Sequence, residues 1–353
     1  MRRLVPEEEE FLLFDTGSDD PLRIVAFATK QGLEDLKKWL DWACDCTFSS
    51  CHKLWYQLLS LHCILGSSKS LPRVWALLPN KTRATYHRFF MLLKTTAKEL
   101  GIELDPKSML TDFEEALFIG FLAEFPDCKT VHCIFHFSSN ICKCFKSCGI
   151  EFTKRYAETE YNLKIRSLTA LAYLPVEDVG EAFDLLADDE DLPDRLLEYM
   201  ASNYVGTLMG NRSKRRTKPR FAIQDWNVHD RVMNNLPRAN NVCEGYNHGF
   251  HALLNCDHPN MNKLVAAMKT SERISRQKKA NYTMGIQSAS GQRKKFQAIT
   301  NQIQEILKRY LAERPEKGTP GWELETVATL KNLARLTKNF EMPKPYTFDD
   351  KDE

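Results

Sequence analysis

The sequence predicts an α/β fold built on a mixed sheet, because apolar segments with strand and helix periodicity follow one another in a particular order. Three strand candidates come first, at Trp42 to Phe48, Leu54 to Leu65 and Leu71 to Leu78. Their links are shorter than the roughly dozen residues of a parallel crossover, so we expect an antiparallel meander. Residues 108–148 then alternate strand, helix, strand and helix, which is typical of an α/β sheet.

The helices complete this order. Residues 81–100 place their apolar side chains on one face, with Thr82 as the expected N-cap and Gly101 after the end. A shorter amphipathic helix is expected over residues 29–40. The order from Trp42 onward is three strands, a helix, a strand, a helix, a strand and a helix, which is the order of a ribonuclease-H-like fold. We therefore expect a ribonuclease-H-like catalytic core, a mixed five-stranded sheet with flanking helices.

Composition restricts the class of protein. A chain of 353 residues with 43% hydrophobic content can bury a large core and form one large domain or two. The net charge is only +2, so any nucleic-acid surface must be local. Eleven cysteines and a charged start without a signal peptide indicate reduced thiols inside the cell. No apolar run reaches the roughly 18 to 20 residues that a membrane span requires.

Two aspartates lie where this sheet would support chemistry. Asp112 directly follows the short strand Ser108 to Thr111, and reacting groups collect at the carboxyl ends of strands in α/β sheets. Asp45 interrupts an apolar strand, where a buried carboxylate is unfavourable unless it is paired or bound to metal. The alternative interpretations are a helix N-cap for Asp112 and an exposed strand position for Asp45.

Five motifs in one order resemble the transposase domain of Mutator-like elements (MULE), a cut-and-paste class of DDE transposase. The resemblance runs from about Ile24 to about Lys278. It departs from the family at Cys46, where the family usually has glycine, and no zinc-binding DNA-recognition module is seen ahead of these motifs. The motifs are WACDCTFSSCHKLWYQLLSLHCI, VWALLPNKTRATYHRFF, MLTDFEEAL, CIFHF and LPRANNVCEGYNHGFH.

The resemblance implies that Asp45, Asp112 and Glu244 are three catalytic carboxylates and metal ligands. It implies DNA strand cleavage and strand transfer in transposition, on double-stranded DNA, by a homo-oligomer in the nucleus. Three clustered carboxylates repel one another unless divalent cations neutralise them, and hard oxygen ligands favour two Mg²⁺ or Mn²⁺ ions. The alternatives are a domesticated DNA-binding or regulatory protein without catalysis, and a different ribonuclease-H-like nuclease. A solvent-facing helix position is the alternative for Glu244.

Polar residues and a Cys-x-x-His pair are expected beside these acids. The amide-rich group around Glu244 suits the orientation of phosphates and carboxylates, although Asn240 or Asn241 is also suited to begin a helix. The Cys-x-x-His pair lacks the spacing of a structural zinc site, so we interpret it as a packed thiol with a hydrogen-bonded imidazole. The predicted site-adjacent residues are Cys133, His136, Arg238, Asn240, Asn241 and Asn247.

Two basic segments are the expected DNA contacts. The segment 212–220 predicts phosphate contacts, a nuclear-import signal, or both. Residues 263–314 are largely helical and carry twelve Lys or Arg against three Glu. This charge predicts a surface that binds the phosphate backbone, and the alternative is that it only keeps the protein soluble. The basic residues predicted to bind DNA are Arg212, Lys214, Arg215, Arg216, Lys218 and Arg220.

The spacing of these features predicts the domain organisation. Residues between the second and third acids read as mostly helical, so we expect a helical insertion before the third acidic residue. The expected parts are a disordered acidic arm at 1–21, the first part of the core at 22–150, the insertion at 151–235, a helix with the third acid that completes the core at 236–262, and a basic helical C-terminal extension at 263–353.

Overall fold

The structure, a computed structural model, describes residues 3–4, 9–66, 69–210, 215–286 and 291–337. The chain divides into two compact units. The first comprises residues 1–133 and 236–289, and the second comprises residues 134–235 and 290–353. Within the described ranges, no helix has the length and apolar character that crossing a membrane would require.

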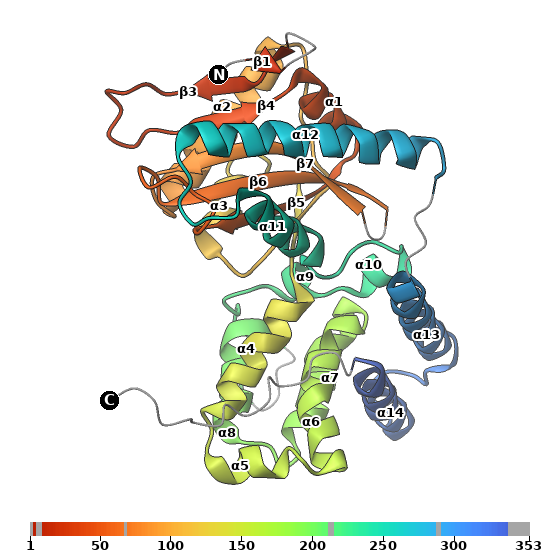
Figure 1. Ribbon diagram of the computed structural model, residues 1–353. Helices are drawn as coiled ribbons and strands as arrows, with labels where there is room; N and C mark the ends of the chain where they lie inside the picture. Colours follow the sequence, from red (N-terminus) through yellow and green to blue (C-terminus); the bar gives the residue numbers. More distant parts are fainter. Residues whose placement is uncertain (1–2, 5–8, 67–68, 211–214, 287–290, 338–353) are drawn as a thin grey trace. The chain divides into compact units, whose positions relative to one another are not determined.

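The first unit contains a mixed seven-stranded sheet in the order β3-β4-β7-β6-β5-β8-β9 (Figure 1). The predicted α/β class is confirmed at this level, but the sheet has seven strands where five were expected. A separate pair, β1 (Arg3–Leu4) and β2 (Glu9–Glu10), lies near the N-terminus. The strands of the sheet are β3 (Leu12–Asp15), β4 (Val25–Ala28), β5 (Asp41–Thr47), β6 (Gln57–Leu65), β7 (Lys69–Leu78), β8 (Ser108–Thr111) and β9 (Lys129–His132).

The central strands pair as the short links predict. Strand β6 is antiparallel to both β5 and β7, with Asp45 opposite Ser60 and Ser60 opposite Trp75. Strand β8 is parallel to β5, and β9 is parallel to β8. The predicted antiparallel meander is therefore confirmed, and the two later strands extend the sheet beyond β5.

The two additional strands come from the N-terminal segment. Strand β3 lies inside the stretch that was expected to be a disordered arm through residue 21, and it pairs antiparallel with β4. Phe11 explains why this segment is ordered, because it is fully buried with its ring 5.6 Å from Phe27 and 5.8 Å from Trp75. The prediction rested on the acidic composition of the segment and did not take Phe11 into account. The expected disorder is therefore wrong for residues 9–21.

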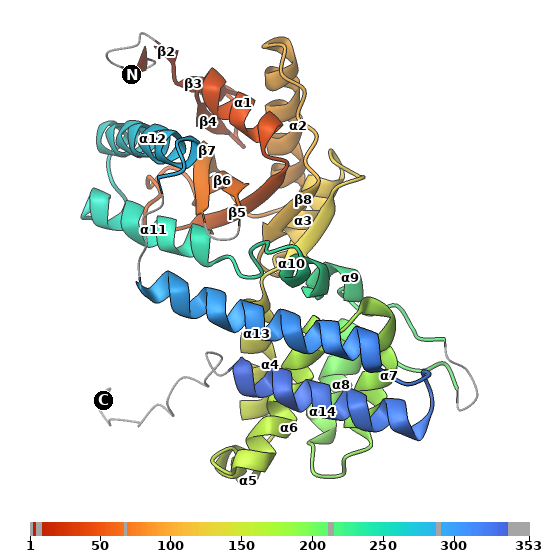
Figure 2. The same cartoon turned by 90° about the vertical axis from the view of Figure 1, so that its right-hand side faces the viewer.

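Helices cover both faces of the sheet. Alternation along the strands separates the faces, since Leu59 and Leu61 pack in one apolar cluster and Leu58 packs in the other. Figure 2 shows α11 and α12 on one side of the sheet and α2 and α3 on the other. The helices of this unit are α1 (Lys30–Lys38), α2 (Arg83–Glu99), α3 (Glu115–Leu122), α11 (Asn241–Leu254) and α12 (Met261–Thr283).

Helix α12 corrects the expected boundary at residue 263. Its residues Leu264 and Met268 are buried in the same apolar cluster as the sheet residues Trp75 and Leu77. The helix carries six Lys or Arg and one Glu, and this basic composition led to the prediction of an exposed extension although the helix also has an apolar stripe. Helix α12 therefore belongs to the first unit, whereas the sequence placed all but its first two residues in a basic helical C-terminal extension.

The second unit is helical and has its own core. Trp226 is fully buried, stacks on Phe137 at 4.6 Å and donates through Nε1 to the Tyr204 carbonyl at 3.1 Å, as expected for a core residue. The unit takes in α4 and the last two helices, so it extends beyond the expected insertion at 151–235. Its α-helices are α4 (Ile134–Lys146), α5 (Ile150–Arg155), α6 (Thr159–Ala170), α7 (Val176–Ala187), α8 (Asp194–Met200), α9 (Ile223–Trp226), α10 (His229–Met233), α13 (Gly291–Glu313) and α14 (Pro320–Leu336). A 3₁₀-helix at Leu171–Tyr173 and a π-helix at Ala201–Val205 lie among them.

Candidate active site

Asp45, within β5, and Asp112, directly after β8, occupy corresponding positions of two neighbouring parallel strands. Ala43 of β5 pairs with Leu110 of β8, and each aspartate follows its partner residue by two positions. Because side chains alternate between the two faces of a sheet, each aspartate side chain points to the same face as the residue two positions earlier, Ala43 or Leu110. Ala43 and Leu110 pack with Cys243 of α11 in one buried cluster. The two carboxylates therefore project toward the face that α11 covers.

Helix α11 brings the third acid to the same place. Glu244 follows the buried Cys243, and Asn247 stands three residues later on the same side of the helix. The Asn247 side chain donates through Nδ2 to Asp45 Oδ2 at 2.8 Å. The structure thus brings Asp45, Asp112 and Glu244 together, although Glu244 lies far along the chain from the other two.

The electrostatics of Asp45 report this convergence. The pKa of Asp45 is raised from its ordinary value of 3.8 to about 7, first by burial and then by the negative charges of Asp112 and Glu244. The backbone N–H of Cys46 and the amide of Asn247 oppose this rise in pKa. A positive charge or a proton at the cluster would relieve the repulsion between the acids.

The position of Asp112 is set by hydrogen bonds from its neighbours. The N-cap of α3 is Glu114, so the interpretation of Asp112 as the cap of that helix is wrong. Asp112 Oδ1 accepts from the Glu114 N–H at 3.3 Å, and the Asp112 carbonyl accepts from His132 Nδ1 at 2.8 Å. Burial lowers the pKa of His132 to about 4, so the ring is neutral near pH 7 and donates from Nδ1.

Glu114 is a fourth carboxylate that the sequence reasoning missed. Its Oε1 accepts from the Tyr86 hydroxyl at 2.7 Å, and the Tyr86 oxygen accepts from Gln57 Nε2 at 2.7 Å. Tyr86 and Gln57 are both fully buried. Burial raises the pKa of Glu114, and the charge of Asp112 adds to the rise. The sequence feature that could have identified Glu114 is its position two residues after Asp112, at a junction between a strand and a helix.

Asn240 fixes the start of α11 and explains the packed thiol. It is the N-cap of the helix and is fully buried. Its backbone N–H donates to Cys133 Sγ at 3.2 Å, and its Nδ2 donates to the Cys44 carbonyl at 3.2 Å. Cys133 is itself fully buried at the end of β9. Asn240 therefore ties the helix that carries Glu244 to the strand that carries Asp45.

The other predicted site-adjacent residues differ in burial and in the element that carries them. Arg238 is half-buried in the segment before α11, and Asn241 is exposed as the first residue of that helix. His136 is half-buried on α4, in the second unit. Cys133, Asn240 and Asn247 form direct hydrogen bonds into the acid-bearing elements of the first unit.

One basic residue of the expected DNA-binding loop has a structural role. Arg216 is half-buried, donates to the carbonyls of Gly180 and Gly206 at 2.8 and 2.7 Å, and forms an ion pair with Asp184. The isolated bridge between Leu208 and Arg216 turns the segment back toward α7, which explains these contacts. Arg216 is thus not the loop cation that the sequence predicts. Arg215, Lys218 and Arg220 are exposed, and Arg212 and Lys214 lie outside the described residues.

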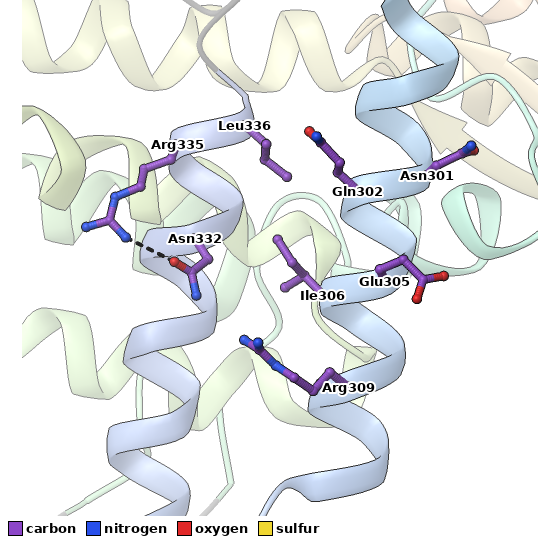
Figure 3. Close-up of a pocket in the computed structure, with 8 residues that line it drawn as sticks. All are labelled: Asn301, Gln302, Glu305, Ile306, Arg309, Asn332, Arg335 and Leu336. Carbon is purple, nitrogen blue, oxygen red and sulfur yellow. Dashed lines mark hydrogen bonds between the residues drawn. The ribbon is translucent and has the colours of Figure 1, made fainter.

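The second unit contains a groove between α13 and α14 with a volume of about 550 Å³ (Figure 3). Its lining includes one carboxylate, Glu305, and none of the predicted site residues. Such a lining does not offer the cluster of acids that divalent cations require. The lining residues are Asn301, Gln302, Glu305, Ile306, Arg309, Asn332, Arg335 and Leu336.

Part of the chain is similar to a known protein family. Residues 42–140 match the family model of the MULE transposase domain. This range confirms the resemblance over the segment that contains Asp45, Asp112 and the Cys133 to His136 motif, and it ends before Glu244. No curated protein matches the chain.

Proposed function

We propose, from the match of residues 42–140 to the MULE transposase domain, that this chain cleaves DNA strands and transfers them during transposition. The observation that carries the proposal is the convergence of three acids. Asp112 comes 67 residues after Asp45 (112 − 45) and Glu244 comes 132 after Asp112 (244 − 112), yet the charges of both act on Asp45. The Asn247 hydrogen bond to Asp45 supports the same convergence.

We infer a ribonuclease-H-like core within the seven-stranded sheet. The order β7-β6-β5-β8-β9, with the first three strands antiparallel and the last two parallel, supports this assignment. Strands β3 and β4 would then be additions at the β7 edge. The helices between β9 and α11 in the sequence support a helical insertion before the third acid.

The donor set of the site fits divalent cations. Asp45, Asp112 and Glu244 offer hard oxygen ligands, and a positive charge beside them would lower the raised pKa of Asp45 and favour its ionised form near pH 7. We propose that these three residues hold two Mg²⁺ or Mn²⁺ ions. When bound, such ions lower the pKa of an attacking water or hydroxyl and stabilise the charge on the leaving oxygen.

The residues around the acids would keep them in position for this chemistry. Asn247 holds one oxygen of Asp45, which restricts rotation of that carboxylate. His132 holds the Asp112 carbonyl, and because its ring is neutral it adds no charge that competes with a cation. Asn240 anchors the first turn of α11 and thereby sets the position of Glu244. Catalysis of this kind depends on groups held in a productive arrangement before the reaction.

Double-stranded DNA is the proposed partner, with a homo-oligomer on DNA as the proposed assembly and the nucleus as the proposed compartment. The exposed cations Arg215, Lys218 and Arg220 support contacts with the phosphate backbone. Such contacts carry little sequence information, so we expect poorly selective binding.

The test is Asp112→Asn, which preserves the shape of the side chain and removes a metal-binding charge. We expect this variant to lose Mg²⁺- or Mn²⁺-dependent nicking of supercoiled plasmid while it retains its affinity for DNA. Asp41→Asn is the matched control, because Asp41 is a half-buried aspartate at the start of β5, the strand that carries Asp45 and pairs with β8. Equal nicking by Asp112→Asn and the parent would exclude the catalytic assignment. A parent that binds DNA without nicking it would favour the domesticated alternative.

A further inference from the structure

The loop between β5 and β6, residues 48–56, has a shape fixed by backbone hydrogen bonds. The Cys51 N–H donates to the Phe48 carbonyl at 3.1 Å, and the Tyr56 N–H donates to the Leu78 carbonyl at 2.9 Å. From a distant part of the chain, the His258 N–H donates to the Ser49 carbonyl at 2.7 Å. Cys51 is fully buried in the apolar cluster beneath α11 and α12. The loop is therefore anchored at several points along its length.

This anchored loop nevertheless exposes three large apolar side chains. Phe48 is 47% exposed, Tyr56 is 48% exposed and Leu54 is 77% exposed. The Phe48 and Tyr56 rings meet edge to face with centroids 5.2 Å apart. Because exposed apolar groups that gather on a fixed surface are unfavourable in water, such groups mark interaction sites.

The loop is continuous with the acid cluster. Phe48 follows Asp45 by three residues, which is at most about 10 Å along an extended chain. On the other side of the loop, Gln57 directly follows Tyr56 and begins the hydrogen-bond path through Tyr86 to Glu114. Glu114 in turn donates its N–H to Asp112. Both ends of the loop thus connect to the segments that carry Asp45 and Asp112.

Exposed cations accompany the aromatic pair. Lys53 lies within the loop and is exposed. Gln57 Nε2 donates to the Asn80 carbonyl at 3.3 Å, which places the start of α2 beside the loop, and Lys81 and Arg83 are exposed there. Aromatic faces with neighbouring cations are the combination by which proteins bind unpaired nucleotides, since bases stack on rings and cations pair with phosphates. A paired duplex hides the faces of its bases and cannot use such rings.

We propose that Phe48 and Tyr56 form a stacking platform for unpaired bases of the DNA strand that reaches Asp45, Asp112 and Glu244. This inference rests on the proposed function and deepens it, because it names a substrate with unpaired nucleotides near the cleaved phosphodiester. Lys53, Lys81 and Arg83 contact the phosphates of the same strand.

The experiment compares DNA binding by the full chain and its Phe48→Ala/Tyr56→Ala variant in EDTA, by fluorescence anisotropy. One probe is a fully paired duplex, and the other has the same sequence with a short unpaired segment that contains 2-aminopurine. We expect the double variant to bind the unpaired probe about 10- to 100-fold more weakly, since one stacked base contributes roughly 1–3 kcal/mol. We expect less than about a twofold change for the paired duplex.

Two control variants separate stacking from folding. Leu324→Ala removes an exposed apolar side chain, 75% exposed on α14 in the second unit and outside both predicted DNA-binding segments, and should leave binding of both probes unchanged. Tyr56→Phe retains the ring face and should bind the unpaired probe as the parent does. Thermal melting of each variant identifies any that fails to fold. If the double alanine variant does not fold, Tyr56→Ala alone tests the proposal, because it should weaken binding of the unpaired probe and not of the paired duplex.

Three results would overturn the proposal. The first is equal weakening for both probes, and the second is no weakening for either. The third is loss of self-association in sedimentation with DNA binding unchanged, which would identify the surface as a contact between copies of the chain. None of these results depends on nicking, so the catalytic proposal is judged separately by Asp112→Asn.

Discussion

Asn247 Nδ2 lies 2.8 Å from Asp45 Oδ2, and this hydrogen bond joins helix α11 to strand β5 across 202 positions of sequence. Glu244 stands one turn earlier on the same helix, so a contact that positions Asn247 also directs Glu244 toward the strand end. The same hydrogen bond opposes the rise in the pKa of Asp45. Asn247 thus links the geometry of the acid cluster to its charge.

Asn247→Ala should raise the pKa of Asp45 further, because the variant loses a donor to the ionised carboxylate. We expect about tenfold weaker Mn²⁺ binding at pH 7, measured by isothermal titration calorimetry, since hydrogen bonds to charged groups contribute roughly 1.5–3 kcal/mol. Asn241→Ala, an exposed asparagine on the same helix, is the matched control. Equal affinities for the two variants would show that Asn247 does not act on the site.

The raised pKa of Asp45 predicts how stability depends on pH. The folded protein holds this proton up to about pH 7, whereas the unfolded chain releases it near 3.8. The free energy of unfolding should therefore fall as the pH rises from about 4 to about 7 and stay low above that range. Asp45→Asn carries no charge, so in EDTA at pH 8 it should be more stable than the parent.

Urea unfolding at pH 4 and pH 8 checks this expectation. The parent and Asp45→Asn should have similar midpoints at pH 4, where the parent carboxyl is protonated. At pH 8, Mn²⁺ should raise the midpoint of the parent more than that of the variant. A variant that is less stable than the parent at both pH values would show that Asp45 has a structural role.

Arg73 is the centre of a buried ion-pair network in the first unit. Its guanidinium lies 2.9 Å from Asp35 of α1 and 3.2 Å from Glu272 of α12, and all three side chains are buried. Arg73→Met leaves two buried carboxylates without this partner, so unfolding should become easier by about 3–5 kcal/mol.

A surface pair provides the control for Arg73. Arg88 lies 2.8 Å from Asp20 with its side chain 37% exposed, and Arg88→Met should change stability by about 0–1 kcal/mol. Both variants are compared with the parent by urea unfolding. Similar small losses of stability in the two variants would mean that the remaining cations suffice to neutralise the buried acids. These cations are Lys279, which pairs with Asp35, and Arg276, which pairs with Glu272.

Arg216 and Lys218 should differ in their effects on DNA binding. Arg216 is held by Asp184, Gly180 and Gly206, so Arg216→Ala should lower the melting temperature and leave the salt dependence of binding unchanged. Lys218 is exposed, and loss of one phosphate contact should reduce the slope of log affinity against log salt by about 0.9. Duplex binding across a salt series checks both expectations, and the reverse assignment of the two effects would contradict them.

The sequence by itself determined the features that depend on neighbouring residues. Short links predict the β5-β6-β7 meander, and the structure confirms it. The N-cap at Thr82 is also confirmed, because its side chain accepts from the Thr85 N–H. The position of Asp112 directly after β8 can also be predicted, because it depends only on the short apolar strand next to it in the sequence. Periodicity, turn length and capping are local, so they can be read from a short window of sequence.

Only the tertiary structure decided the features that depend on distant partners. The burial of Phe11 makes an acidic segment into β3, and the sheet beneath Leu264 makes a basic helix part of the core. Asp184 makes Arg216 a structural cation, and Tyr86 makes Glu114 a neighbour of the site. In each case composition describes the exposed side of a segment, whereas its place in the fold depends on which apolar surface or opposite charge the rest of the chain presents to it.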